Sequence, residues 1–153
     1  MPGPAPGRAG REPLEGSRFL SDTVAEKVRA YRLLRRLKQE DVADGMRELR
    51  HHTWTRQTVS DVERVQRHLT VDELLGLSIV FDVPLNELLD PVPVGGGPAP
   101  ALDVGLPVPI PPDIVPHWSA GASIFLNSEI RDGKPGVRVT AVGHLADQEE
   151  EQQ

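Results

Sequence analysis

Apolar residues recur at helical spacing through residues 21–90, and this spacing predicts five short helices. In the first, Val24, Val28, Tyr31 and Leu34 fall on one stripe at i, i+4, i+7 and i+10. Short helices joined by short connections make an all-α domain, and about 70 residues are enough for such a domain to fold alone. We therefore predict a five-helix domain over 21–90.

Polar residues mark where three of these helices should begin. Thr23 with Glu26, and Thr70 with Glu73, have the spacing of a capping box, in which each side chain binds the other residue's backbone N–H. A third helix is expected to begin near Thr55, whose hydroxyl can accept from the first helical turn. These signals place starts for the first, third and fourth helices.

Helical spacing also predicts which residues of the second and fourth helices face the core. The second helix is expected over about 39–50, and the fifth over 84–89, where Pro84 stands at a position that needs no N–H. The inward residues would be Val42, Ala43, Met46 and Leu49 on the second helix and Leu74, Leu77, Ser78 and Phe81 on the fourth.

Proline and glycine separate this domain from its flanks. Residues 1–20 combine prolines and glycines with charges, and we predict a disordered arm. Residues 91–116 contain nine prolines and a run of three glycines, which excludes helix and favours an extended linker.

Residues 117–146 favour β-structure. Two short runs, 123–130 and 137–142, enclose a turn rich in glycine and proline, so we expect a small β-hairpin, although an isolated hairpin is marginally stable in water. The chain then ends in an acidic tail, 147–153.

Charge is distributed unevenly along the 153 residues, whose net charge is −6. Residues 18–68 carry 12 basic and 8 acidic side chains, whereas residues 69–153 carry 3 and 13. The acidic total therefore hides a basic segment inside the helical region. The chain has no cysteine, which excludes disulfides and thiolate zinc sites, and it has no apolar run long enough for a membrane span. We expect a cytoplasmic protein.

The third helix carries the candidate chemistry. Val59 and Val62 define an inward side, and the opposite side is polar. Arginine can pair with guanine, glutamine with adenine, and aspartate can accept from cytosine, so this face suits the base edges of DNA. An ordinary solvated helix face would also match it. The polar residues are Arg56 at the edge of the face and Gln57, Ser60, Asp61, Arg64 and Arg67 on it.

Four stretches in order resemble the Cro/phage-repressor helix-turn-helix family, also called the xenobiotic-response-element family. They are VRAYR at 28–32, LKQEDVA at 37–43, WTRQTVSDVE at 54–63, and the segment 74–89 with LLGL and FDVPLNELL. The resemblance covers about residues 24–90. It implies a repressor-like five-helix fold in which the third helix reads DNA.

The resemblance also implies residue roles. Gln39, at the start of helix two, would meet the DNA backbone and outer base pairs. Arg32 of helix one would form an ion pair with Glu63, which the helical projection places at the edge of the buried side, where an unpaired charge is costly. The base-reading positions would be Arg56, Gln57, Ser60 and Asp61, and the backbone contacts Lys38, Gln39, Arg50, Arg64 and Arg67.

The chain departs from the family pattern in places. Lys38 stands where a serine or threonine cap is usual, so the second helix is expected to lack a side-chain cap. The stretch between Ala43 and Thr55 is about six residues longer than the family's tight turn. An extra helical turn and a wider loop would absorb this insertion, and Trp54 could pack as a hydrophobic staple before Thr55.

We therefore expect a sequence-specific transcriptional regulator that binds double-stranded DNA, as a homodimer with helix three in the major groove. The alternative is a protein-interaction module, an antitoxin or adaptor, that uses residues 117–146 to hold a protein partner. No catalytic constellation is present, and His51, His52 and His68 lack the spacing of metal ligands. No enzyme activity, cofactor or metal is expected. Dimer contacts could come from Leu85 and Leu89 or from residues 117–146.

Overall fold

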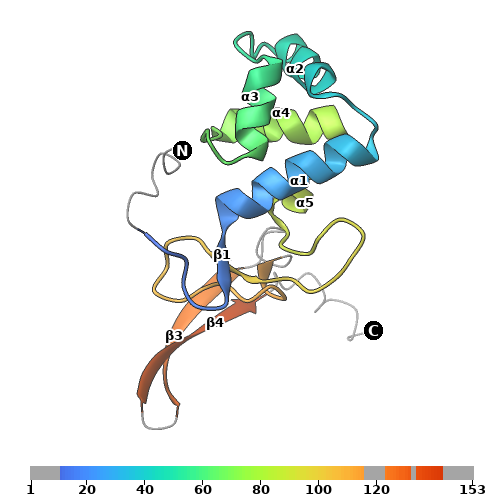
Figure 1. The fold of residues 1–153 in the computed structure, drawn as a ribbon. Helices are drawn as coiled ribbons and strands as arrows, with labels where there is room; N and C mark the ends of the chain where they lie inside the picture. Colours follow the sequence, from blue (N-terminus) through green and yellow to red (C-terminus); the bar gives the residue numbers. More distant parts are fainter. Residues whose placement is uncertain (1–10, 116–122, 132–133, 143–153) are drawn as a thin grey trace, which may run out of the picture.

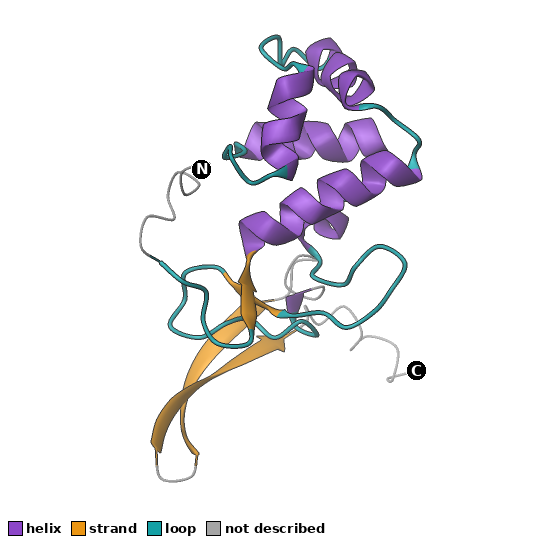
Figure 2. Ribbon diagram, in the orientation of Figure 1, coloured by secondary structure: helices purple, strands orange, loops and turns teal. Residues whose placement is uncertain are grey.

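The computed structural model describes residues 11–115, 123–131 and 134–142, and its helices and strands occupy opposite ends of the molecule (Figures 1 and 2). The prediction of a five-helix, all-α domain is confirmed. The longest helix has 15 residues, and no helix in these ranges is long and apolar enough to cross a membrane. In chain order the elements are β1 (Ser17–Phe19), α1 (Leu20–Leu34), α2 (Gln39–Glu48), α3 (Arg56–Glu63), α4 (Val71–Phe81), α5 (Leu85–Leu89), β2 (Ala101–Asp103), β3 (Ser123–Arg131) and β4 (Lys134–Val142).

All five helices contribute to one apolar core. Burying a side chain of this size contributes about 1.5–3 kcal/mol, so the shared core is what holds such short helices together. The expected inward residues are buried, except that Leu74 is only partly buried, Leu49 is 36 % exposed and Leu34, the last residue of α1, is 59 % exposed. Leu49 was wrongly predicted because α2 ends one residue before it. The wholly buried side chains of this core are Val28, Val42, Ala43, Met46, Trp54, Val59, Leu77, Phe81 and Leu88.

Two of the predicted helix starts are confirmed and one is wrong. Thr55 and Thr70 cap α3 and α4, and their hydroxyls accept from the N–H groups of Thr58 and Glu73. Thr23 does not cap α1, because β1 leads directly into a helix that begins at Leu20. The Thr23 side chain is instead buried inside the first turns, and its hydroxyl has no hydrogen-bond partner among the described residues.

The second helix begins without a cap from Lys38, as expected. Its first turn is stabilised by an acidic side chain within the helix, because Asp41 Oδ2 accepts from the backbone N–H of Lys38 at 2.6 Å. This is half of a capping box, formed by the acidic residue alone.

Two short strands lie within the predicted arm and linker and pair with each other. Strand β1 pairs in parallel with β2, in the register Ser17 with Ala101 and Phe19 with Asp103. Leu102, Ile110 and Val115 form a second buried cluster under this pair. The strands lie more than 80 residues apart in sequence, so no local pattern could show their pairing. Residues 1–10 lie outside the described residues.

The predicted hairpin is present. Strands β3 and β4 are antiparallel, and the pair Arg131–Lys134 closes a two-residue connection. Both strands are longer than the runs predicted from sequence. Glu129 and Arg138 form an ion pair across the hairpin at 2.8 Å. The acidic tail, 147–153, lies outside the described residues.

Candidate nucleic-acid interface

The outer face of α3 is polar, as the helical projection predicts. Val59 and Val62 anchor the inner face of the helix in the core. On the outer face, the side chains of Arg56 and Gln57 are exposed, and those of Ser60 and Asp61 are half-buried. The four residues expected to read bases therefore share one accessible side of α3.

Hydrogen bonds organise this outer face. Gln57 Nε2 donates to Asp61 Oδ1 at 2.7 Å, and Arg64 Nη2 donates to the same oxygen at 3.2 Å. These are the i,i+4 and i,i+3 neighbours of a helix surface. The Asp61 carboxylate is therefore balanced by a cation and an amide, so its negative charge is partly offset on a surface expected to meet phosphates.

One polar cluster ties the C-terminal end of α3 to α1 and α2. Arg32 donates to both carboxylate oxygens of Glu63, with Nε–Oε1 at 2.5 Å and Nη2–Oε2 at 3.1 Å. The two side chains are only 12 % and 7 % exposed, so the pair is largely shielded from water. The ion pair expected from the sequence is thus present in the structure.

Gln39 completes this cluster in a way that sequence reasoning missed. Its Nε2 donates to Glu63 Oε2 at 3.0 Å, which connects the first residue of α2 to the last residue of α3. The family resemblance suggested only contact with DNA for Gln39. In the free protein it also fixes the angle between the two helices.

A second polar cluster ties the N-terminal end of α3 to α4. Trp54 is wholly buried, and its Nε1 donates to Glu73 Oε1 at 2.9 Å. Arg67 donates to both oxygens of the same carboxylate, at 2.5 and 3.1 Å, and its guanidinium lies 5.4 Å from the centre of the Trp54 ring. The N–H of Thr70 provides a fourth bond, at 2.9 Å.

These contacts change the titration of Glu73. Burial alone would raise the pKa of Glu73, but the hydrogen bonds from Arg67, Thr70 and Trp54 outweigh burial and lower the pKa to about 2. Sequence reasoning assigned Glu73 to a capping box and missed its link to Trp54. The available signal was the indole N–H, which needs a partner when the ring is buried.

Arg67 has a different place from the one expected. The sequence suggested a DNA-backbone contact on the outer face of α3, but the helix ends at Glu63 and Arg67 lies in the connection to α4. There it is committed to the buried Glu73 carboxylate. The structure thus gives Arg67 a structural role that the sequence did not predict.

A loop follows α2 in the long connection to α3. Helix α2 stops at Glu48, and Arg50 takes a left-handed backbone conformation with φ of 71°, which turns the chain back. Arg47 Nη1 then donates to the carbonyl of Trp54 at 2.6 Å. Trp54 shares the core with Val59, as a staple residue would.

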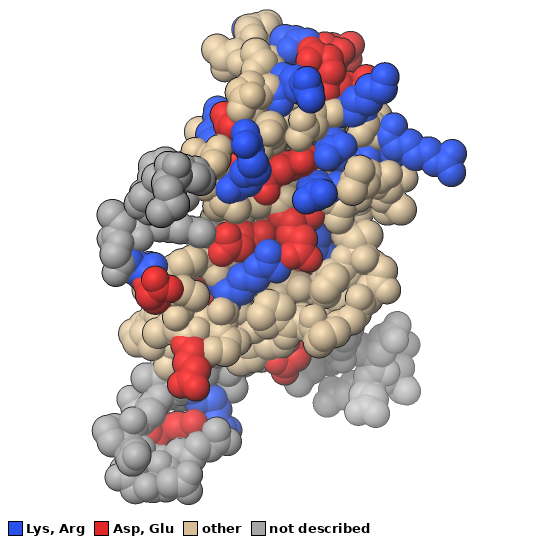
Figure 3. Space-filling model, viewed as in Figure 1, with Lys and Arg blue, Asp and Glu red and all other residues tan. Residues whose placement is uncertain are grey.

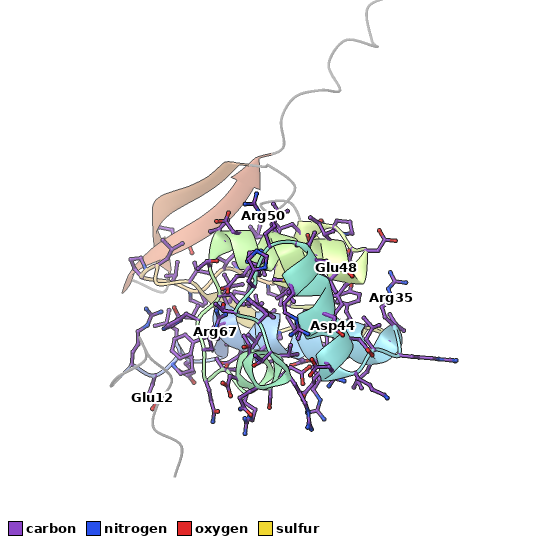
Figure 4. All side chains as sticks on the ribbon, turned by 90° about the horizontal axis from the view of Figure 1, so that it is seen from above. Glu12, Arg35, Asp44, Glu48, Arg50 and Arg67 are labelled. Carbon is purple, nitrogen blue, oxygen red and sulfur yellow. The ribbon has the colours of Figure 1, made fainter. Side chains whose placement is uncertain are left out.

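The other residues expected to contact the DNA backbone differ in where they lie relative to α3. Lys38 precedes α2 and is exposed, and Arg64 follows α3 and is exposed. Arg50 is also exposed, but Figure 4 shows it on the side of the domain where α4 lies, away from α3. The neighbouring His51 lies against Gly76 of α4, which agrees with that position.

Basic side chains gather over the helical domain on the face shown in Figure 3. Acidic side chains lie among them, and several of these are paired, including Glu63 with Arg32 and Asp61 with Arg64. Pairing offsets the negative charge of these carboxylates around α3.

Residues 28–88 match the family model described as Helix-turn-helix, and they form a helix-turn-helix domain of the Cro/phage-repressor type, a class found in DNA-binding transcription regulators. Comparisons with curated proteins and with solved structures each gave no significant match.

Proposed function

We propose that this protein is a sequence-specific transcriptional regulator that reads double-stranded DNA with α3 in the major groove. One observation carries the proposal: the two ends of α3 are fixed by buried polar clusters while its outer face is left accessible. A reading helix held in this way loses little conformational freedom on binding, so its contacts can discriminate between bases.

The base contacts would come from the four outer residues of α3. Arg56 has the donors for a bidentate contact with guanine, and Gln57 has the donor and acceptor for adenine. Asp61 can accept from the amino group of cytosine, and Ser60 can pair with several bases. Binding would require the Gln57–Asp61 hydrogen bond to open or to be shared with a base.

The phosphate contacts would come from residues that flank α3. Lys38 and Gln39 stand at the start of α2, and Arg64 stands directly after α3. Such contacts supply affinity and salt dependence but carry little sequence information. Arg50 and Arg67 are left out of this set, because one lies away from α3 and the other binds Glu73.

A homodimer would place two α3 helices in successive major grooves of a pseudo-palindrome, with half-sites about 34–36 Å apart. Leu89, one of the residues expected to make dimer contacts, is partly buried and packs against the helical core.

Selection of bound duplexes from a random pool, with the full chain, tests the proposal. We expect enrichment of one motif with two related half-sites. Recovery of a random pool at low salt without enrichment would contradict sequence-specific reading. Absence of any duplex binding would favour the protein-interaction module.

A further inference from the structure

Arg36 and Arg50 follow the ends of α1 and α2 in a left-handed backbone conformation, with φ of 57° and 71°. The two helix ends are built in the same way. At each, the N–H of the arginine donates to the carbonyl three residues before it, at 3.0 Å, and the N–H of the next residue donates to the carbonyl five residues before it. This is the Schellman motif, in which glycine is the usual left-handed residue.

The left-handed conformation is unfavourable for arginine at position 36. It brings the Cβ atom of an L-residue close to the following carbonyl oxygen, whereas glycine has no Cβ atom and takes this conformation freely. The Arg36 side chain is exposed, so it fills no space in the core. Glycine would therefore end α1 with less strain, and the presence of arginine needs another explanation.

The Arg36 side chain makes no hydrogen bond or ion pair with the part of the chain that the structure describes. Its neighbours differ from it in this respect. Arg32 donates to both carboxylate oxygens of Glu63. Arg35 donates through Nε to the carbonyl of Phe81 at 2.9 Å. Arg36 thus offers the five N–H donors of its guanidinium to a partner outside the described residues.

Arg36 lies in the turn between α1 and α2, near a residue proposed to contact phosphate. Lys38 follows two residues later, directly before α2. The turn is also connected to α3, because Arg32 donates through Nη1 to the carbonyl of Leu37 at 3.2 Å and binds Glu63 through its other nitrogens. The segment that carries Arg36 is therefore tied to the C-terminal end of the reading helix.

We propose that Arg36 contacts a DNA phosphate beside Lys38, and that this contact accounts for an arginine in the left-handed position. The inference rests on the proposed DNA-binding function and adds a residue to its phosphate contacts. A guanidinium can bind two oxygens of one phosphate with parallel hydrogen bonds. Arg36 lies outside α3, so its contribution to binding should be the same for every DNA sequence.

Glycine substitutions in the full chain test the cost to the fold. Arg36→Gly and Arg50→Gly should each raise the midpoint of urea denaturation, because each relieves a left-handed residue and removes no contact among the described residues. A lower midpoint for Arg36→Gly would mean that the arginine side chain stabilises the fold, and it would overturn the proposal.

A salt series with one random duplex tests the phosphate contact. Arg36→Gly should reduce the slope of log affinity against log salt by about one and weaken binding roughly five- to tenfold at 0.1 M salt. Arg50→Gly is the matched control, because Arg50 shares the backbone conformation but lies away from α3, and it should change neither quantity. Arg36→Asn tolerates the same conformation without a charge and should reproduce the loss, whereas Arg36→Lys should keep the slope.

The outcomes separate this inference from the proposed function. If the unsubstituted chain binds DNA and the slope is unchanged in Arg36→Gly and Arg36→Asn, the Arg36 contact is wrong and the proposed function stands. An equal reduction in Arg50→Gly would indicate a general effect of charge and would also overturn the contact. A loss seen with a selected duplex but not with the random one would place Arg36 against a base. If the unsubstituted chain binds no duplex, the proposed function fails and the inference fails with it.

Discussion

Trp54 donates its indole N–H to Glu73 at 2.9 Å, and this bond joins the residue before the cap of α3 to the first turn of α4. Both groups are buried, so water cannot replace a lost partner. The bond is one of four that the Glu73 carboxylate accepts. The start of α3 is thereby fixed from inside the protein, and the long loop before it does not loosen the helix.

Trp54→Phe should lower the free energy of unfolding by about 1–3 kcal/mol, because the ring is largely kept while a buried acceptor loses one donor. Urea denaturation measures this. The matched background is Glu73→Met, which has no acceptor oxygen, and in it the same Trp54→Phe change should have a smaller effect if the two residues are coupled. Equal losses in the two backgrounds would show that the hydrogen bond contributes nothing.

Stability should fall in acid as Glu73 becomes protonated. Its pKa is about 2 in the folded protein against an ordinary value of 4.5, so its contribution is present above pH 4.5 and is lost as pH falls towards 2. The contribution is on the order of 2 kcal/mol, since each pKa unit corresponds to about 1.4 kcal/mol and partial solvent screening reduces the total. Glu73→Gln should flatten this part of the stability–pH curve. An unchanged slope between pH 4.5 and 2 would contradict the assignment.

Removing one partner of the Arg32–Glu63 pair should lower the free energy of unfolding more than removing both partners. Arg32→Met leaves a shielded carboxylate without its cation, and we expect a loss of about 3–5 kcal/mol. Arg32→Met with Glu63→Leu should recover much of it. The exposed pair Arg18–Glu26 is the control, and Arg18→Met should cost no more than about 1 kcal/mol. Chemical denaturation compares all three. Additive losses at positions 32 and 63 would rule out coupling.

Gln57→Ala and Arg56→Ala should each weaken binding to the selected DNA by about 1–3 kcal/mol and relax the choice at one base pair. The reason is that both side chains stand on the accessible face of α3. Binding titrations with the selected duplex and its single-base variants measure this. An equal loss on specific and random DNA would assign both residues to the phosphate backbone instead.

Arg64 and Arg50 are both exposed arginines, but only Arg64 lies next to α3. Arg64→Ala should therefore reduce the slope of log affinity against log salt by about one, whereas Arg50→Ala should leave it unchanged. A salt series on one duplex compares the two variants. A reduced slope for Arg50→Ala would return that residue to the DNA contact set.

Local sequence determined much of the helical domain. The Thr55 and Thr70 caps, and the inward valines of α3, depend on residues three or four positions apart, and helix geometry alone brings such residues together. The outer face of α3 follows from the same periodicity. The Arg32–Glu63 pair spans 31 residues and was predictable only because the chain resembles a known family.

The tertiary structure determined the contacts between residues that are distant in sequence. Glu73 lies 19 residues from Trp54, and Gln39 lies 24 residues from Glu63, so neither contact has a local pattern. Strand β1 looked like part of a disordered arm because its partner lies in a proline-rich segment more than 80 residues away. Such contacts form only when the packed core brings distant segments together, since the entropy of closing these loops must be offset by burial elsewhere.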